Sequence, residues 1–266
     1  QPSFHFRPHE APVNSVIDEP YLVTSLDDHY QISTKNYPPL RFKIEGENAK
    51  FTLKSSMFRN AFFRLESRRG YESIGDLWSP GYFKINLYPE KQVTLIASTE
   101  SWETINALNA SEALLAENER RNQLLLNAPL AAQTEFGGEL VLAADQFIIT
   151  PASRIEDATR AKALGDDIRT IIAGYHWFTD WGRDTMIAFE GLTLNTGRFQ
   201  EAAWILRTFQ HYVQEGLIPN MFPEGEKGGL YHTADATLWF FHAVHRYVQF
   251  TEDRDTLRLL LPTLLD

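Results

Sequence analysis

The stretch Phe199-Gln-Glu-Ala-Ala-Trp-Ile-Leu-Arg-Thr-Phe-Gln-His-Tyr-Val-Gln-Glu215 decides the fold of the C-terminal half of this chain. Apolar residues recur in it with the 3.6-residue period of an amphipathic helix, which places them on one face. That face holds Phe199, Ala202, Ala203, Leu206 and Val213. Gly216 follows directly, and glycine commonly ends a helix. The pattern therefore predicts a helix over 199–215.

The neighbouring segments repeat this alternation of helix and loop. We predict helices over 139–148, 184–195, 234–250 and 256–265, and loops over 152–170 and 217–233. Helices that alternate with loops in this way are typical of stacked helical hairpins. Residues 137–266 are therefore expected to form one helical domain.

Residues 1–100 have a different character, with short and partly alternating runs separated by turn signals. The runs are Tyr21–Thr24, Arg41–Ile44, Lys50–Lys54, Phe58–Leu65, Tyr82–Tyr88 and Gln92–Ala97. Short strands with frequent turns predict an antiparallel β-sandwich. Residues 101–136 begin with a stretch rich in helix-favouring Ala, Leu, Glu and Arg, and we expect a helical linker there.

Composition excludes several classes of function. The net charge is −10 and there is no basic stripe, which argues against a nucleic-acid or anionic-membrane partner and suits a neutral polymer. No apolar run approaches the ~20 residues that span a bilayer, and the N-terminus lacks a signal-peptide pattern. The chain has no cysteine, which fits a reducing compartment, so we expect a cytoplasmic protein.

The first polar–aromatic cluster is Gly174-Tyr-His-Trp-Phe-Thr-Asp-Trp-Gly-Arg-Asp-Thr185, where a loop enters a helix. Unpaired charge is costly to bury, so Asp180, Arg183 and Asp184 among tryptophans indicate a polar site. An Arg–Asp pair beside tryptophan can hold adjacent sugar hydroxyls, because Arg donates hydrogen bonds and Asp accepts them. The alternative is that Asp184 or Asp180 caps the helix.

The second cluster is Tyr231-His-Thr-Ala-Asp-Ala-Thr-Leu-Trp-Phe-Phe241, with Asp235 in the first turn of a helix. A helix N-terminus stabilises a carboxylate anion, whereas a general acid needs a raised pKa. Burial beside Tyr231 and Trp239, with a second carboxylate nearby, would have to outweigh that effect. Helix capping is the alternative role for Asp235.

Gly216-Leu-Ile-Pro-Asn-Met-Phe-Pro-Glu-Gly225 connects the two clusters. Pro219 and Pro223 stiffen it, and the Asn220 amide can hydrogen-bond a sugar; the alternative is an ordered loop without a ligand role. From these three segments the substrate-binding candidates are Tyr175, Trp177, Trp181, Arg183, Asp184, Asn220 and Trp239.

Other kinds of site have little support in the sequence. The four histidines 211, 232, 242 and 245 do not form a convincing metal set, although His242 and His245 are three residues apart on one helix. There is no phosphate loop, no dinucleotide fingerprint and no Gly-x-Ser-x-Gly elbow. We therefore expect neither a metal nor a cofactor.

Three motifs in this order resemble one enzyme family. They are Trp181–Thr185, Gly216–Asn220 and Thr233–Phe240. Together they look like the catalytic domain of bacterial and archaeal glycogen-debranching enzymes, which are amylo-α-1,6-glucosidases on an (α/α)6 barrel related to glucoamylases. Arg64–Gly70 and Asp76–Gly81 look like the N-terminal β domain of the same proteins.

The resemblance implies an α-glucan such as glycogen or limit dextrin as substrate, and roles for particular residues. Trp181, Arg183 and Asp184 match the element that holds the terminal glucose. Asp235 matches the general acid that protonates the glycosidic oxygen. Related barrels invert configuration, with a second carboxylate roughly 6.5–9.5 Å away that activates water.

The sequence also departs from this family. About five helices are predicted after residue 137, fewer than a complete barrel needs, so we expect only the first helices of an incomplete (α/α)6 barrel. The family's general-base Glu lies farther downstream, and Glu190, Glu224 and Glu226 are poor substitutes by position. We therefore expect a fragment or processed chain that is inactive alone and leaves apolar helix faces uncovered.

Three alternatives remain open at this point. They are another (α/α)6 glycosidase of glucoamylase or trehalase type, a non-catalytic glucan-binding module, and a purely structural helical-hairpin protein. The enzyme hypothesis requires that Arg183, Asp184 and Asp235 converge on a sugar-sized cavity lined by tryptophan, although about fifty positions separate them.

Overall fold

The computed structural model describes residues 1–17, 21–151, 154–223 and 228–265. The chain divides into two compact units, Gln1–Ala116 and Glu117–Asp266. The division falls inside helix α3 (Ala110–Asn127), within the segment predicted as a helical linker. The domain boundaries at 100 and 136 stay predictions.

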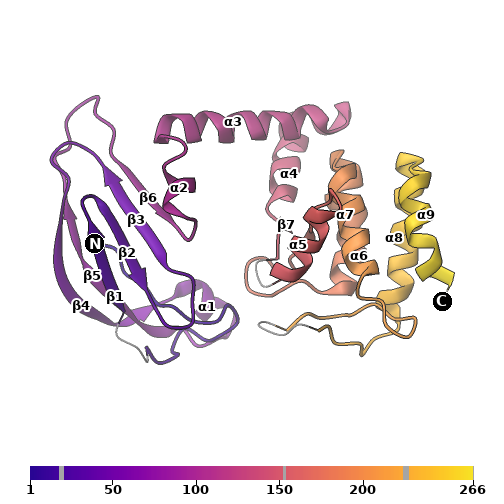
Figure 1. Cartoon of the computed structure of the whole chain (residues 1–266), viewed down its shortest axis with the longest axis horizontal. Coiled ribbons are helices and arrows are strands. Elements are labelled where there is room, and N and C mark those ends of the chain that lie inside the picture. The colour runs from indigo at the N-terminus through magenta and orange to yellow at the C-terminus, as the bar shows by residue number, and fades with distance from the viewer. Residues whose placement is uncertain (18–20, 152–153, 224–227, 266) are drawn as a thin grey trace. The chain divides into compact units, whose positions relative to one another are not determined.

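The first unit is built from two antiparallel sheets (Figure 1). The four-stranded sheet has the order β1 (Leu22–Leu26), β2 (His29–Ser33), β3 (Leu40–Glu45) and β6 (Thr94–Ser98). The second sheet is a ribbon of β4 (Lys50–Phe62) and β5 (Ile74–Lys84). The short helices α1 (Arg64–Arg68) and α2 (Trp102–Ile105) complete the unit. The predicted antiparallel β structure is confirmed.

Aromatic side chains hold the two sheets together. Tyr30 of β2 and Phe42 of β3 lie against Phe51 of β4 and Phe83 of β5, with ring centroids between 4.6 and 5.8 Å apart. Aromatic rings bury large apolar areas, and pairs at this spacing add stabilisation beyond that burial. These four aromatic side chains therefore pack between the two sheets, and Phe42 is the most buried of them.

One long strand replaces two of the predicted ones. The runs 50–54 and 58–65 belong to β4, whose register against β5 shifts between Leu53 and Ser56 and again between Phe58 and Ala61. A β-bulge interrupts alternation without ending a strand, so the pattern looked like two strands. The run also ends at Phe62 rather than at residue 65, because α1 begins at Arg64.

The second unit is helical (Figure 1). After α3 it contains the helices α4 (Glu135–Asp145), α5 (Ile155–Ala163), α6 (Gly182–Leu192), α7 (Phe199–Gln210), α8 (Asp235–Thr251) and α9 (Arg254–Leu265). Two single turns, η1 (Leu130–Ala132) and η2 (Leu194–Thr196), and the short strands β7 (Ile148–Ile149) and β8 (Thr170–Ile171) connect them. No helix in the described ranges is long and apolar enough to cross a bilayer.

The core of this unit lies among α6, α7 and α8. Phe189 of α6, Leu206 and Phe209 of α7, and Phe240 of α8 are all at most 2% exposed and belong to one cluster. Helices α6, α7 and α9 all pack against α8, and Figure 1 shows α8 and α9 side by side. The predicted hairpin arrangement is therefore present, and closure into an (α/α)6 barrel stays a prediction.

Three local predictions were wrong. Residues 152–170 were expected to be a loop, yet α5 occupies Ile155–Ala163; residues 152 and 153 lie outside the described part. None of the α5 residues is fully buried, so an apolar stripe could not reveal this helix. The helix predicted over 139–148 begins at Glu135 and ends at Asp145, and Ile148 lies in β7.

The helix predicted over 199–215 ends at Gln210 instead. Gly216 is in a left-handed conformation with φ 74°, but it belongs to a tight turn in which Gln214 pairs with Leu217. Positive φ is the conformation that glycine adopts without strain, so Gly216 marks a turn and not the helix end. The helix predicted over 234–250 is confirmed as α8.

Candidate active site

Arg183 and Asp235 meet although 52 residues separate them. Arg183 is the second residue of α6 and Asp235 is the first residue of α8. The guanidinium donates to both carboxylate oxygens, from Nε to Oδ2 at 2.6 Å and from Nη2 to Oδ1 at 2.8 Å. The side chains keep 41% and 46% of their surfaces exposed, so the pair is accessible to a ligand.

A second pair joins the same two helices farther along. Arg246 of α8 donates to Glu190 of α6 from Nε at 2.7 Å and from Nη2 at 2.6 Å. Both pairs lie in the same order along α6 and α8, so the two helices run parallel and their N-termini lie at the same end. Sequence patterns missed this pair, because neither residue belongs to either polar–aromatic cluster.

The loop between the clusters holds the ends of α6 and α8. Asn220 is 2% exposed, and its Oδ1 accepts the backbone N–H of Arg183 at 3.1 Å, while its carbonyl accepts the N–H of Gly182 at 2.9 Å. The Thr237 hydroxyl of α8 accepts the N–H of Ile218 at 3.0 Å. Asn220 therefore satisfies free N–H groups of α6, and a contact between its side chain and a sugar stays a prediction.

Gly182 makes this close approach possible. A Cβ at residue 182 would lie 2.2 Å from the Pro219 carbonyl oxygen, which is far inside van der Waals contact. Only glycine therefore allows the loop to reach the first turn of α6. In the Trp-Gly-Arg-Asp motif, the second residue is therefore glycine because a side chain there would clash with the loop.

The helix-capping alternative for the first cluster does not hold. Trp181 occupies the N-cap position of α6 and makes no side-chain cap. Asp180 instead turns into the protein, and Asp184 lies in the first turn with its side chain exposed. Among the described residues no hydrogen-bond partner is found for the Asp184 carboxylate, which leaves it available to a ligand.

Asp180 belongs to a buried ion pair that the sequence did not reveal. Its carboxylate accepts hydrogen bonds from Arg154 and, at 2.8 Å, from the Thr170 hydroxyl. Arg154 and Asp180 are 8% and 5% exposed, and the Arg154 guanidinium stacks 3.5 Å above the Phe222 ring. Asp180 therefore connects the segments around α6 from a buried position.

The aromatic candidates occupy two places. Trp239 lies one turn after Asp235 on the same face of α8 and is 37% exposed. Residues 173–179 form a loop with hydrogen-bonded ends, in which Tyr175 packs on Phe147 and Trp177 stacks on His176. Trp181 is partly buried beside Arg183. The approach of Tyr175 and Trp177 to Arg183 stays a prediction.

The electrostatics favour an ionised Asp235. Hydrogen bonds from Arg183 lower its pKa most, and the Arg183 charge and the N–H groups at the start of α8 lower it further. Desolvation acts in the opposite direction and is outweighed. The burial that a general acid needs is therefore not present in this state, as the position at a helix N-terminus suggested.

Replacing Arg183 by Gln should raise the pKa of Asp235 toward its ordinary value of 3.8. Because the folded pKa is now depressed, the pair stabilises the fold above that value and this contribution disappears as the pH falls through the folded pKa. We expect the variant's Tm to lie slightly below wild type at pH 7, with the difference closing in strong acid. Carboxyl NMR titration and thermal unfolding measure both effects.

Arg258→Gln is the matched control, because Arg258 pairs with the exposed Asp255 in the first turn of α9. It should leave the Asp235 titration unchanged. A Tm difference for Arg183→Gln that is the same at pH 7 and in strong acid would contradict the argument.

Metal binding receives no support from the geometry. No group of three or more His, Cys, Asp or Glu side chains that could hold a metal ion is found among the described residues.

Comparisons with known proteins cover most of the chain. Residues 142–266 match the family described as amylo-alpha-1,6-glucosidase, and residues 1–94 match the family described as the glycogen debranching enzyme N terminal. The glycogen debranching enzyme of Saccharomyces cerevisiae is 34% identical over 98 residues, which are 35% of this chain and 6% of that protein. No solved structure matches the chain.

Proposed function

Because this chain belongs to the glycogen debranching enzyme family, we propose that it carries the glucose-binding and proton-donating part of an amylo-α-1,6-glucosidase. The substrate is an α-1,6-linked glucose branch of glycogen or limit dextrin. The chain spans 6% of the length of the yeast relative that it matches, so the activity proposed is that of the whole protein.

The observation that carries this proposal is the Arg183–Asp235 pair at the adjacent N-termini of two parallel helices. The pair uses two of the five N–H donors of a guanidinium. The remaining donors of Arg183 and the exposed carboxylate of Asp184 offer opposite hydrogen-bonding character to neighbouring sugar hydroxyls. Trp181 and Trp239 flank them with apolar surface for the pyranose ring.

In the proposed mechanism, Arg183 donates hydrogen bonds to Asp235 in the free protein and to sugar hydroxyls when substrate is bound. When the terminal glucose binds, its hydroxyls compete with Asp235 for the Arg183 guanidinium, and Asp235 loses hydrogen bonds that keep it ionised. Its pKa then rises, assisted by the water that the sugar displaces. Asp235 then takes up a proton from solvent and donates it to the glycosidic oxygen as the bond between that oxygen and C1 breaks. Water attacks C1 from the opposite face with inversion, and we assign its general base to no residue of this chain.

The depressed pKa of Asp235 also favours a second candidate function, a glucan-binding module without catalysis. In that case Asp235 serves only to orient Arg183 toward sugar hydroxyls. Trp181→Ala should then weaken glucan binding, while any hydrolysis would not depend on Asp235.

A substrate panel tests the proposed class of reaction. The protein encoded by the complete reading frame is incubated with phosphorylase limit dextrin, maltose and trehalose, and released glucose is measured. Limit dextrin should be the preferred substrate, since the family resemblance implies attack at α-1,6 branches. Glucose from trehalose alone would contradict the debranching assignment and support a trehalase-type enzyme.

A further inference from the structure

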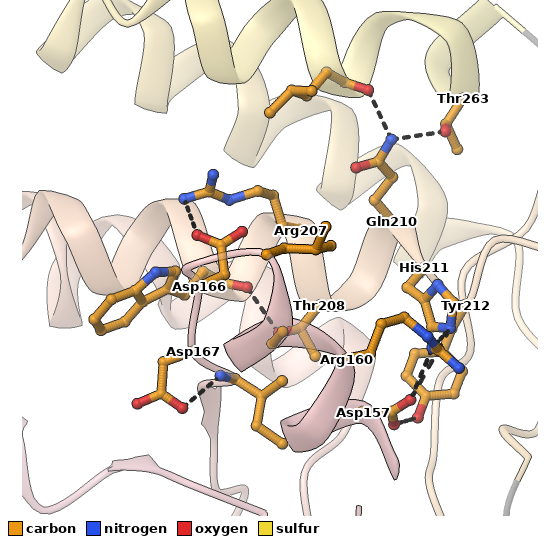
Figure 2. Close-up of a pocket in the computed structure, with 15 residues that line it drawn as sticks. Asp157, Arg160, Asp166, Asp167, Arg207, Thr208, Gln210, His211, Tyr212 and Thr263 are labelled. Carbon is orange, nitrogen blue, oxygen red and sulfur yellow. Dashed lines mark hydrogen bonds and ion pairs between the residues drawn. The ribbon is translucent and has the colours of Figure 1, made fainter.

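A cavity of about 640 Å³ lies in the second unit among α5, α7 and α9 (Figure 2). Its volume falls within the range of small-molecule sites, roughly 300–1,000 Å³. The cavity is lined by none of the residues assigned above to glucose binding or proton donation. It therefore needs an explanation of its own.

The carboxylates and guanidinium groups on its wall are all paired, and Asp167 pairs with Arg169, which lies outside the lining. Arg207 pairs with Asp166 at 3.1 Å and Arg160 pairs with Asp157 at 3.2 Å, and the Tyr212 hydroxyl also donates to Asp157 (Figure 2). A phosphate or carboxylate ligand would need cationic donors that are not already neutralised. A neutral ligand with many hydroxyls, by contrast, can exchange hydrogen bonds with donors and acceptors alike.

Two donors on this wall lack an acceptor. The indole Nε1 of Trp204 and the Nε of Arg207 are both shielded from solvent, and neither has a hydrogen-bond partner within the described part of the chain. A buried donor without a partner typically costs about 1–3 kcal/mol, so native structures rarely keep one without a reason. Both donors belong to side chains that line the cavity, so a ligand bound there would change their surroundings.

Apolar surface completes the recognition chemistry. Leu164, Ile168 and Leu259 line the cavity together with the Trp204 ring. Pyranose rings present C–H faces with hydroxyls at their edges, which matches apolar walls with polar groups between them. Gln210 adds a fixed amide, because its Nε2 donates to the Leu259 carbonyl at 2.8 Å.

We propose that this cavity is a second saccharide site, which binds a short α-glucan segment away from the Arg183–Asp235 pair. The neutral polyhydroxyl class of the ligand follows from the wall; the choice of α-glucan among saccharides rests on the proposed function. Such a site would retain the branched polymer on the protein while a chain end is at the Arg183–Asp235 pair.

The test follows the six tryptophan indole N–H signals of the 15N-labelled 266-residue chain during a maltotetraose titration. Each signal is assigned by a single Trp→Phe variant. The Trp204 signal should shift and saturate, because the Trp204 ring lines the cavity that the ligand would fill. Inorganic phosphate at the same concentrations should leave it unchanged.

Cavity filling provides the matched variants. Ala161→Phe adds a ring to a residue that lines the cavity and should weaken the affinity reported by Trp204 by about tenfold or more. Ala163→Phe adds the same ring to an exposed position of α5 outside the lining and should leave the affinity unchanged. Neither variant alters a residue of the Arg183–Asp235 site.

The outcomes separate this inference from the proposed function. Saturable shifts at both Trp204 and Trp181 support both, whereas a Trp204 shift alone supports the cavity and counts against the Arg183 site. A Trp181 shift without a Trp204 shift overturns the cavity inference alone. A Trp204 shift with phosphate instead of maltotetraose also overturns it. An equal loss of maltotetraose affinity in Ala161→Phe and Ala163→Phe does the same.

Discussion

Replacement of Asp235 by Asn is expected to reduce glucose release from limit dextrin by roughly a hundred- to ten-thousandfold, the contribution typical of a general acid. Asparagine keeps the shape of the side chain and can still accept from Arg183, but it has no proton to give to the glycosidic oxygen. The measurement is kcat for the complete protein. KM should change much less, because the sugar contacts of Arg183 and Asp184 persist.

Asp255→Asn is the control for a purely structural effect. Asp255, like Asp235, is an acidic residue in the first turn of a helix, here α9. If Asp235 only stabilises its helix, both variants should lower the Tm slightly and leave kcat unchanged. That result, with weaker glucan binding in Trp181→Ala, would favour the binding-module alternative.

Replacement of Asp180 by Asn is expected to destabilise the second unit by about 3–5 kcal/mol, because it leaves a buried guanidinium without its counter-charge. The Arg154 guanidinium lies over the Phe222 ring and has another buried nitrogen, Nη1, without a partner among the described residues. Denaturant unfolding followed by circular dichroism measures the loss.

Two further variants test whether the unpaired buried charge causes the loss of stability in Asp180→Asn. Asp167→Asn breaks a more exposed pair with Arg169 and should cost little, about 1 kcal/mol or less. Arg154→Met combined with Asp180→Leu removes both charges and should recover most of the stability lost in Asp180→Asn. If Asp180→Asn changes the free energy of unfolding little but greatly weakens glucan binding, Asp180 contacts the ligand and the argument from the buried ion pair is wrong.

The role of Asp180 shows what local patterns can and cannot report. The reasoning that charge among aromatic residues requires a partner was sound, but the partner proved to be Arg154, in a segment that was predicted to be a loop. Sequence spacing contains no information on which distant residue neutralises a charge. The same applies to Asn220, because its position in the loop did not indicate that its amide oxygen accepts the Arg183 N–H in the first turn of α6.

The predictions for the bulged strand β4 and the polar helix α5 were wrong for a related reason. Hydrophobic periodicity reports the burial of one face, and it becomes weak where a bulge shifts that face or where an element buries little. Helices α7 and α8 bury continuous apolar stripes, and the start of α7 and both ends of α8 were predicted to within one residue. The predicted and observed bounds of an element therefore agree best where the element buries a continuous apolar face.

By itself, the sequence determined the antiparallel β structure of the first unit, the helical hairpins of the second, and membership of the debranching family. Each of these depends on residues close together in the chain, through periodicity or short motifs. Only the tertiary structure decided that Arg183 meets Asp235, that Asp180 is buried with Arg154, and that a cavity lined by paired charges lies among α5, α7 and α9. In each contact the two residues are far apart in the chain and are brought together only by tertiary packing. The strength of a hydrogen bond or ion pair depends on the distance between its atoms in space, which local sequence patterns do not report.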